Sequence, residues 1–325
     1  MKSDKIYIVM YHYTRDLKHS RYPQIKGIDY ALFEQQLQFF VKNFSVITME
    51  DIINYVQTEE KDYELPENPI LLTFDDGYID NFTVALPLLK KYGIQGSFFI
   101  PGKTFTENVL LDVNKVHFIL ASANNTSELV KDIYLLLDEA RKEPVYKNIP
   151  SNKELYAKYG TANRFDNADV IFCKRILQTA IPEKLRNDMS SMLFAKYVGL
   201  SESNFARELY MNVDQINCLK DNGMFIGLHG YDHYWLGNLP PKQMKQDIDR
   251  ALNVMAPFID ANAWVMNYPY GSYNKEVIDY IKSKKCVLGL TTIVDRAEFS
   301  EENRYTFQRL DCNDFWPISE NWKKY

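Results

Sequence analysis

Three short segments of the sequence carry residue types that can bind a metal ion, transfer a proton or stabilise an oxyanion. The first, Thr73-Phe74-Asp75-Asp76-Gly77, follows an apolar run at 69–72. Two adjacent carboxylates repel each other and lose hydration when they are buried, so a cation or strong hydrogen-bond donors must compensate them. The pair therefore indicates a positively charged partner, although Asp-Asp-Gly is also an ordinary turn before a helix.

The second segment contains two histidines four residues apart. His229 and His233 follow an apolar run at 224–228. Imidazoles at this spacing on one turn can converge on a single metal ion, and the next ligand then comes from elsewhere in the fold. A histidine on an apolar face is usually a hydrogen-bonded core residue, so the metal interpretation depends on both residues lying just after a buried strand.

The third segment, at 264–271, is a strand-like run that is stopped by Pro269 and Gly271. Such a stop turns the backbone sharply and can aim an amide N–H into a cleft, as stabilisation of an oxyanion requires. Taken alone, the segment is more typical of a plain turn that ends a strand.

Short apolar runs that precede these segments have the length of buried strands, and further runs lie at 6–10, 96–100 and 287–292. Helical patterns lie between them, at 30–43, 80–92 and 274–284. This alternation predicts an α/β fold with its chemistry in the loops after the strands.

The alternation stops between residues 103 and 212. Helices are predicted there over 126–141, with Thr126 or Ser127 as the N-cap, and over 169–179, 182–198 and 203–220. We therefore expect one domain over residues 1–325, with an α-helical insertion at 103–212 that lies within it.

Composition excludes several classes of protein. Apolar residues make up 46% of the 325, and 38 Lys+Arg against 43 Asp+Glu give a net charge of −5, so the chain is neither disordered nor suited to nucleic acid or to anionic membranes. The four cysteines form no CxxC pair, which argues against thiolate metal sites and a disulfide framework. No apolar stretch suggests a signal peptide or a membrane span, so we expect a cytoplasmic protein. The oligomeric state is left open.

Together the three segments resemble the polysaccharide deacetylases of the NodB-homology type, carbohydrate esterase family 4. The first motif of that family, T-F-D-D-G, is matched in full. The second, H-[S/T]-x-x-H, has Gly230 in place of the hydroxyl residue, and the third, R-x-P-[Y/F/W], has Asn267 in place of the arginine. The strings at 9–12 and 268–274 resemble the branch that deacetylates poly-N-acetylglucosamine. The resemblance covers 5–102 and 213–312 and implies a distorted (β/α)7-8 barrel.

The resemblance also implies an activity, which is hydrolysis of an N-acetyl amide on a saccharide or polysaccharide precursor, with release of acetate and a free amine. Asp76, His229 and His233 would bind one divalent metal ion; this set suits zinc, and cobalt or nickel accept the same ligands. Asp75 would be the general base, and the backbone N–H of Tyr270 would stabilise the oxyanion.

Two family residues are missing and need substitutes. The last family motif supplies a histidine as general acid, and none occurs at 289–295; His12, at the end of the first predicted strand, is our candidate for the acid or for a substrate contact. Arg309, after the last predicted strand, is the candidate for the arginine that orients Asp75. For both residues, an ordinary structural or surface position is an open alternative.

Aromatic residues make up 14% of the chain, and 23 residues are tyrosine, which suits a cleft that binds sugars. The candidates for substrate contacts, all in the two loops beside the predicted metal, are Tyr231, Trp235, Tyr268 and Pro269, with Tyr273 as a further exposed ring. Two other functions are left open. One is a related hydrolase that acts on a different, non-sugar or cyclic amide in a tight pocket, and the other is a non-catalytic glycan-binding or scaffold protein.

Overall fold

The computed structural model describes residues 5–57 and 64–325. The chain divides into two compact units, and each is described by itself. The first takes in the described residues of 1–18, 27–108 and 207–325, and the second takes in 19–26 and 109–206. The first unit contains the main β-sheet, and the second is helical.

The sheet of the first unit is mostly parallel, in the order β1-β5-β6-β7-β8-β9. The short strand β4 pairs with β5, and β1 also pairs with β11 in parallel and with β10 in antiparallel orientation. A separate pair is formed by β2 and β3. The bounds are β1 Lys5–Tyr11, β2 Thr14–Arg15, β3 Ile28–Asp29, β4 Ser45–Val46, β5 Pro69–Asp75, β6 Ser97–Ile100, β7 Phe225–Leu228, β8 Trp264–Asn267, β9 Cys286–Leu290, β10 Ala297–Glu298 and β11 Leu310–Asp311.

The segment 304–311 connects the two edges of this sheet. Phe307 forms a parallel bridge with Leu290 at the end of β9, and Leu310 pairs with Val9 in β1. The sheet is therefore strongly curled, which confirms the predicted α/β fold with a distorted parallel barrel.

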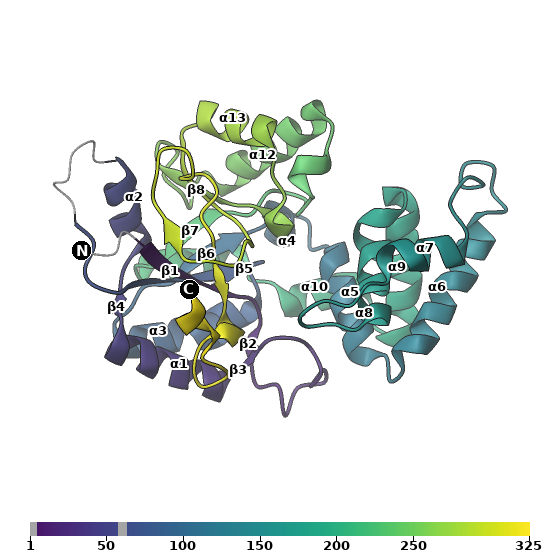
Figure 1. Ribbon diagram of the computed structural model, residues 1–325, viewed down its shortest axis with the longest axis horizontal. Helices are drawn as coiled ribbons and strands as arrows, with labels where there is room; N and C mark the ends of the chain where they lie inside the picture. Colours follow the sequence, from purple (N-terminus) through teal and green to yellow (C-terminus); the bar gives the residue numbers. More distant parts are fainter. Residues whose placement is uncertain (1–4, 58–63) are drawn as a thin grey trace. The chain divides into compact units, whose positions relative to one another are not determined.

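Alternate apolar residues of β1, β5, β6 and β8 face two different cores, as the two-residue period of a strand requires. In β1, Ile8 belongs to a core that includes α2, whereas Val9 belongs to the larger core beneath α1, α3, α12 and α13. In Figure 1 the strands lie between α1 and α3 on one side and α12 and α13 on the other. Leu71 shares the face of Ile8, so Asp75, four residues further along β5, continues that face where the strand ends.

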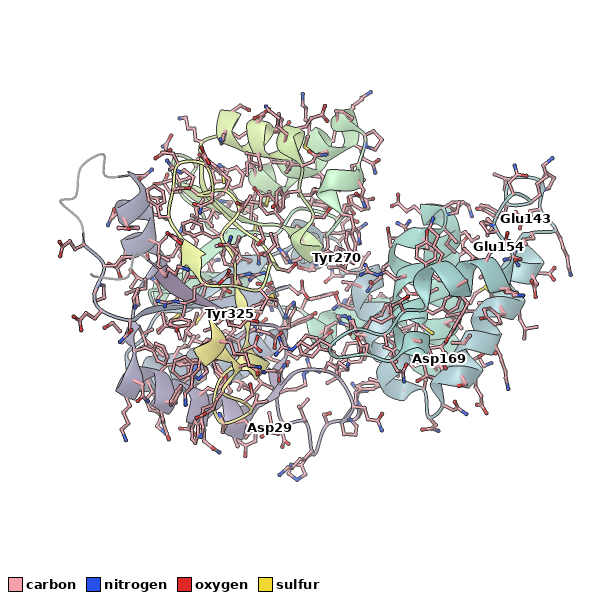
Figure 2. The ribbon with its side chains drawn as sticks, in the orientation of Figure 1. Asp29, Glu143, Glu154, Asp169, Tyr270 and Tyr325 are labelled. Atoms are coloured by element: carbon pink, nitrogen blue, oxygen red, sulfur yellow. The ribbon has the colours of Figure 1, made fainter. Side chains whose placement is uncertain are left out.

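The helices of the first unit match the predicted helical segments where their ends have caps. The predicted helix at 30–43 coincides with α1, and the Asp29 carboxylate, labelled in Figure 2, caps it by accepting from Ala31. The predicted segment 80–92 consists of a π-helical turn and α3, which ends at the left-handed Gly93. The bounds are α1 Tyr30–Asn43, α2 Met49–Gln57, α3 Leu86–Tyr92, α4 Gly102–Thr106, α11 Val213–Asp221, α12 Pro241–Met255 and α13 Lys275–Ser283.

Among its described residues, the second unit contains helices and the loops that connect them, and no strand. Asp169, labelled in Figure 2, accepts hydrogen bonds from Ser127 and Tyr156 and so joins α6, α7 and α8. The predicted N-cap of α6 is wrong, because Asn125 and not Thr126 or Ser127 accepts from the first turn. The bounds are α5 Asp112–Ser122, α6 Thr126–Ala140, α7 Asn152–Tyr159, α8 Ala168–Arg175 and α9 Glu183–Tyr197, and α10 Glu202–Leu209 spans the boundary at 206.

The single helix predicted over 203–220 is also wrong. It is divided into α10 and α11, because Tyr210 forms an antiparallel bridge with Tyr78 and Met211 donates to the carbonyl of Gly77. Asn212 then caps α11 with a side chain that accepts from Gln215. Across residues 5–57 and 64–325, no helix is long and apolar enough to cross a membrane.

Candidate metal centre and active site

The carboxyl ends of neighbouring strands bring the predicted site residues together. Asp75 is the last residue of β5, His229 directly follows β7, and Asn267 is the last residue of β8. Because β5, β6, β7 and β8 are consecutive parallel neighbours, their carboxyl ends share one edge of the curled sheet. The three segments singled out in the sequence therefore meet at this edge.

Asp76, His229 and His233 form a buried cluster there. Their candidate ligand atoms all lie within 4.8 Å of one another. The Nε2 atoms of His229 and His233 are 3.3 Å and 3.1 Å from the same oxygen, Oδ1 of Asp76. That oxygen is buried and has no hydrogen-bond partner in the described parts of the chain.

This cluster suits a divalent cation. Nδ1 of His229 lies 2.7 Å from the carbonyl oxygen of Asn267. Since a carbonyl only accepts, Nδ1 carries a proton, and Nε2 is the nitrogen of His229 that is available to a metal ion. Burial lowers the pKa of His233, which favours the neutral ring that binds a metal ion. Two imidazole nitrogens and a carboxylate oxygen that face one point are the donor set of many divalent metal sites. The geometry does not select one metal.

The second oxygen of Asp76 is held by a tyrosine. The hydroxyl of Tyr78 donates to Oδ2 at 2.5 Å, and the buried ring of Tyr78 stacks on Tyr13 with centroids 4.0 Å apart. Burial alone raises the pKa of Asp76, but the imidazoles beside it hold that pKa well below its ordinary value. The sequence marks Tyr78 as a residue of the site only by its place directly after the Asp-Asp-Gly turn.

Three residues of the site have left-handed backbone conformations. The φ angles are 72° at Asp76, 56° at His233 and 57° at Tyr270. A residue with a Cβ pays of the order of 1–3 kcal/mol for this region, and such strain persists where the surrounding structure enforces it. Each angle belongs to the sharp turn that follows a strand and directs the backbone back across the site.

Asp75 is buried, 2% exposed, and ion-paired. Nη1 and Nη2 of Arg309 donate to its two oxygens, Oδ1 and Oδ2, at 2.9 Å and 2.8 Å, and Nδ2 of Asn267 donates to Oδ1 at 2.6 Å. Burial is the largest influence on the pKa of Asp75 and raises it, but the charge and hydrogen bonds of Arg309, together with His12 and His229, outweigh burial and lower the pKa. Asp75 is therefore a carboxylate at neutral pH.

Arg309 is itself held in place by several acceptors. It is 1% exposed, and it donates from Nε to the carbonyl of Thr291 at 2.7 Å and from Nη1 to Thr73 Oγ1 at 3.1 Å. Nη2 also donates to Oδ1 of Asn267 at 2.9 Å. The expected contact of Arg309 with Asp75 is thus present. Asn267, which stands where the family motif has an arginine, connects Asp75 and Arg309 by a hydrogen bond to each.

His12 lies at the edge of this network. Its Nε2 is 3.9 Å from Oδ2 of Asp75, and its side chain is 36% exposed. It follows β1, the neighbour of β5. The structure therefore places His12 beside the carboxylate, beyond direct hydrogen-bond distance and open to solvent.

A stacked pair of aromatic rings adjoins the metal cluster. The rings of Trp235 and Tyr270 stack with centroids 4.4 Å apart and planes at 9°. The Tyr270 ring also meets His233 edge to face, at 4.7 Å. Both residues are half-buried, and Figure 2 labels Tyr270 on the turn that follows β8.

The expected exposure of Tyr231 is wrong, and two further predicted contact residues, Tyr268 and Pro269, are also buried. Tyr231 is buried and its hydroxyl donates to Glu107 at 2.7 Å, while the guanidinium of Arg250 lies 3.8 Å from its ring centroid. Tyr268 is fully buried, with its hydroxyl bonded to the carbonyl of Tyr305. Packing occupies the faces of both rings. Pro269 is also buried and shapes the turn.

Comparisons with known proteins agree with this geometry. Residues 62–135 and 195–288, slightly more than half of the chain, match the family described as polysaccharide deacetylase. YxkH of Bacillus subtilis (strain 168), which carries a provisional name as a polysaccharide deacetylase, is 33% identical over 104 residues, 32% of this chain. The match spans about a third of that relative, 34% of its length.

Solved structures show the same fold at low sequence identity. The Streptococcus pyogenes deacetylase PplD, in complex with acetate, is 17% identical with a TM-score of 0.56, and the alignment covers 98% of this chain and 96% of PplD. IcaB from Ammonifex degensii is 17% identical with a TM-score of 0.55, over 100% and 99% of the two chains. The de-N-acetylase from Aggregatibacter actinomycetemcomitans is 16% identical with a TM-score of 0.56, over 98% and 99%.

The family match includes the Asp75-Asp76 turn and the two histidines, and the curled parallel sheet brings these residues to one edge. Sequence, fold and site therefore lead to the same conclusion. This chain belongs to the polysaccharide deacetylase family.

Proposed function

We propose that the protein hydrolyses an N-acetyl amide on a sugar or polysaccharide precursor and releases acetate and a free amine. The observation that carries this proposal is the position of a charged carboxylate, Asp75, next in sequence to Asp76, whose oxygen faces His229 and His233. The names of the structural neighbours, among them a de-N-acetylase and a deacetylase in complex with acetate, support the same reaction.

Asp76, His229 and His233 would hold one divalent metal ion, for which we propose zinc, with cobalt and nickel as alternatives. When bound, the metal polarises the amide carbonyl and lowers the pKa of the attacking water. Tyr78 and the carbonyl of Asn267 fix the orientations of Asp76 and His229, so the donor atoms are held for the ion in advance.

Asp75 would accept the proton of the attacking water. Its Oδ1 accepts hydrogen bonds from both Asn267 and Arg309, whereas Oδ2 accepts one from Arg309 and faces His12. Oδ2 is therefore the oxygen suited to take the proton. Because Arg309 lowers the pKa of Asp75, this carboxylate is a weak base that holds the proton briefly.

His12 would then deliver a proton to the leaving amine. An amine is a poor leaving group until it is protonated, so the reaction needs an acid near the base. His12 lies within 4 Å of Oδ2 of Asp75 and is open to solvent. The backbone N–H of Tyr270 would stabilise the charge that develops on the acyl oxygen, and the left-handed turn at this residue sets the direction of that N–H.

The stacked pair of Trp235 and Tyr270 supports a saccharide as the substrate. Parallel aromatic rings beside a metal ligand offer a flat apolar surface on which a pyranose face can pack. This surface takes the place of the wider set of exposed rings expected from the sequence.

The experiment that tests the proposal measures acetate release by the metal-loaded protein. The substrates are N-acetylglucosamine, its oligomers and nucleotide-linked N-acetyl sugars, with simple non-sugar N-acetyl amides as comparison, and Asp75→Asn is the matched inactive variant. We expect acetate from at least one sugar and a loss of 10²-fold or more in Asp75→Asn. Release only from non-sugar amides would favour the related hydrolase, and glycan binding without acetate would favour the non-catalytic protein.

A further inference from the structure

The turn between the two histidine ligands is held through its backbone. This turn, residues 229–233, presents two carbonyls to α4: the carbonyl of Gly230 accepts from the N–H of Gly102 at 3.0 Å, and that of Tyr231 accepts from the N–H of Lys103 at 3.1 Å. The carbonyls on one side of the turn are therefore fixed by a neighbouring element.

A single carboxylate holds the amides of the same turn. Asp247 in α12 is 4% exposed. Its Oδ2 accepts from the N–H of Tyr231 at 3.0 Å, and its Oδ1 accepts from the N–H of Asp232 at 2.8 Å. Both oxygens are thus used on two consecutive peptide groups, and both of these lie between the metal ligands His229 and His233.

The glycine of this turn leaves room for that carboxylate. Gly230 has a φ of 68°, and a Cβ built on it would lie 3.0 Å from Oδ2 of Asp247. This is the position where the family motif carries a hydroxyl residue. Here a side chain at 230 and the carboxylate of Asp247 would compete for one space. The absence of a side chain at Gly230 therefore leaves the approach of the Asp247 carboxylate to the turn unobstructed.

The orientation of His233 depends on this backbone. Whereas Nδ1 of His229 bonds to the carbonyl of Asn267, Nδ1 of His233 is buried with no hydrogen-bond partner among the residues that the structure describes. No hydrogen bond outside the cluster therefore fixes its ring, and the place of its Nε2 follows from the position of the turn and from contacts with the rings of His229 and Tyr270.

We propose that Asp247 is a positioning residue, which sets the distance and direction between His229 and His233 through the peptide groups of Tyr231 and Asp232. It does not touch the metal or the substrate. The inference rests on the metal site of the proposed function, and it adds a residue of α12 to the groups that determine metal affinity.

The test is the affinity of the metal-free protein for Zn²⁺, measured by competition with a chromophoric chelator. Asp247→Ala removes both hydrogen bonds, and Asp247→Asn keeps the size of the side chain but places an amide N–H₂ against a backbone N–H. Asp249→Asn, in the same helix but exposed, is the matched control. We expect the Kd to rise ~10- to 100-fold in both Asp247 variants and to be unchanged in the control.

Co²⁺ supplies a second readout that a purely structural role would not move. A displaced histidine changes the visible absorption bands of bound Co²⁺, so we expect altered bands in folded Asp247→Asn. Zn²⁺ affinities within threefold of wild type, whether or not the melting temperature falls, would overturn the inference. If Asp247→Ala does not fold, Asp247→Asn decides. A wild-type protein that binds neither ion would overturn the proposed metal site itself.

Discussion

The ion pair between Asp75 and Arg309 replaces the positive charge that the third family motif lacks in this sequence. Asn267 stands where the family motif has an arginine, and Arg309 reaches the same carboxylate from the segment that connects β9 and β1. A buried carboxylate needs a positive partner in space, and the position of that partner in the sequence can vary.

Removal of Arg309 should therefore affect both stability and activity. Arg309→Met leaves Asp75 buried and uncompensated, so we expect the free energy of unfolding to fall by about 3–5 kcal/mol and acetate release to fall by 10²-fold or more. Urea unfolding and acetate assays measure the two effects. Arg304→Met, in the same segment but bonded to the carbonyl of Val287, is the control. Full activity in Arg309→Met would show that Asp75 does not need its partner.

The contribution of His12 to the reaction can be distinguished from that of the other site residues by comparing two substrates. If His12 protonates the leaving amine, His12→Ala should lose 10²-fold or more in turnover of an N-acetyl sugar. The same variant should stay within about threefold of wild type on an activated aryl acetate, whose leaving group needs no proton. His19→Ala, exposed and in the second unit, is the control. A loss under about tenfold on the sugar would reject the acid role.

Residue types and spacing predicted the groups that carry charge, and not the groups that orient them. Asp75, Asp76, His229 and His233 lie in motifs whose chemistry is readable from the sequence. Asn267 and Asp247 act through hydrogen bonds that exist only after distant segments pack together. Tyr78 bonds to Asp76, only two residues away, but this contact depends on the conformation of the turn between them. The positions of Tyr231 and Tyr268 beside the motifs favour contact with substrate, but the burial of each ring is decided by what packs against it.

At the level of the elements, the turns that follow the strands fix the positions of the site residues. Gly271 follows the left-handed Tyr270 and has a φ of 65°; a Cβ there would lie 2.3 Å from Thr292 Oγ1 and 2.9 Å from its backbone nitrogen. A side chain at 271 would therefore displace the turn that carries the Tyr270 amide.

A comparison of two left-handed glycines, Gly199 and Gly271, separates the cost of this clash from the cost of the backbone conformation. Gly199 has a φ of 71° and no atom within 4 Å of an added Cβ, so Gly199→Ala should cost only the backbone strain, about 1 kcal/mol. Gly271→Ala adds the clash, and we expect it to cost at least ~2 kcal/mol more and to reduce acetate release. Denaturant unfolding of both variants measures the difference. Equal costs would contradict the account of this turn.

Asp247 in helix α12 should make the free energy of unfolding depend on pH. Burial raises the pKa of this carboxyl from 3.8 to about 6. The backbone hydrogen bonds from Asp232 and Tyr231 lower the pKa, but by less than burial raises it. The carboxylate of Asp232 raises the pKa further, and Lys103 lowers it. Between these pH values the folded protein holds a proton that the unfolded chain has lost, so the stability contribution of Asp247 falls as the pH rises.

The measurement is the free energy of unfolding of metal-free wild type and Asp247→Asn across pH 4–7. The stability of wild type relative to the variant should decrease by up to ~3 kcal/mol between about pH 4 and pH 6. Groups common to both proteins cancel in this difference. A difference that is independent of pH, or that grows with pH, would contradict the assignment.

The predicted helices and strands agree with the structure where local signals define an element, and fail where a distant contact ends it. The helix at 30–43 has a cap and a clear apolar face, and it was predicted to the residue. The helix predicted over 203–220 is interrupted because Tyr210 pairs with Tyr78, more than a hundred residues away. No local pattern at 210 encodes that partner.

At the level of the whole molecule, the residues of the site come from the first unit alone. This unit is discontinuous in sequence, and 109–206 of the second unit lie between its parts. We propose that these helices are an insertion into a barrel that is complete without them, as the sequence suggested for 103–212. The contribution of 19–26 to the second unit was not foreseen, because no motif marks that segment.

The most direct test of the account is acetate release from an N-acetylated sugar by one protein sample in three states: as purified, after its metal has been removed by a chelator, and after one equivalent of Zn²⁺ has been added back. Asp76→Asn, treated identically, is the control. The account predicts that removal abolishes acetate release, that one equivalent restores it, and that the variant stays inactive throughout. Undiminished release by metal-free wild type would contradict it.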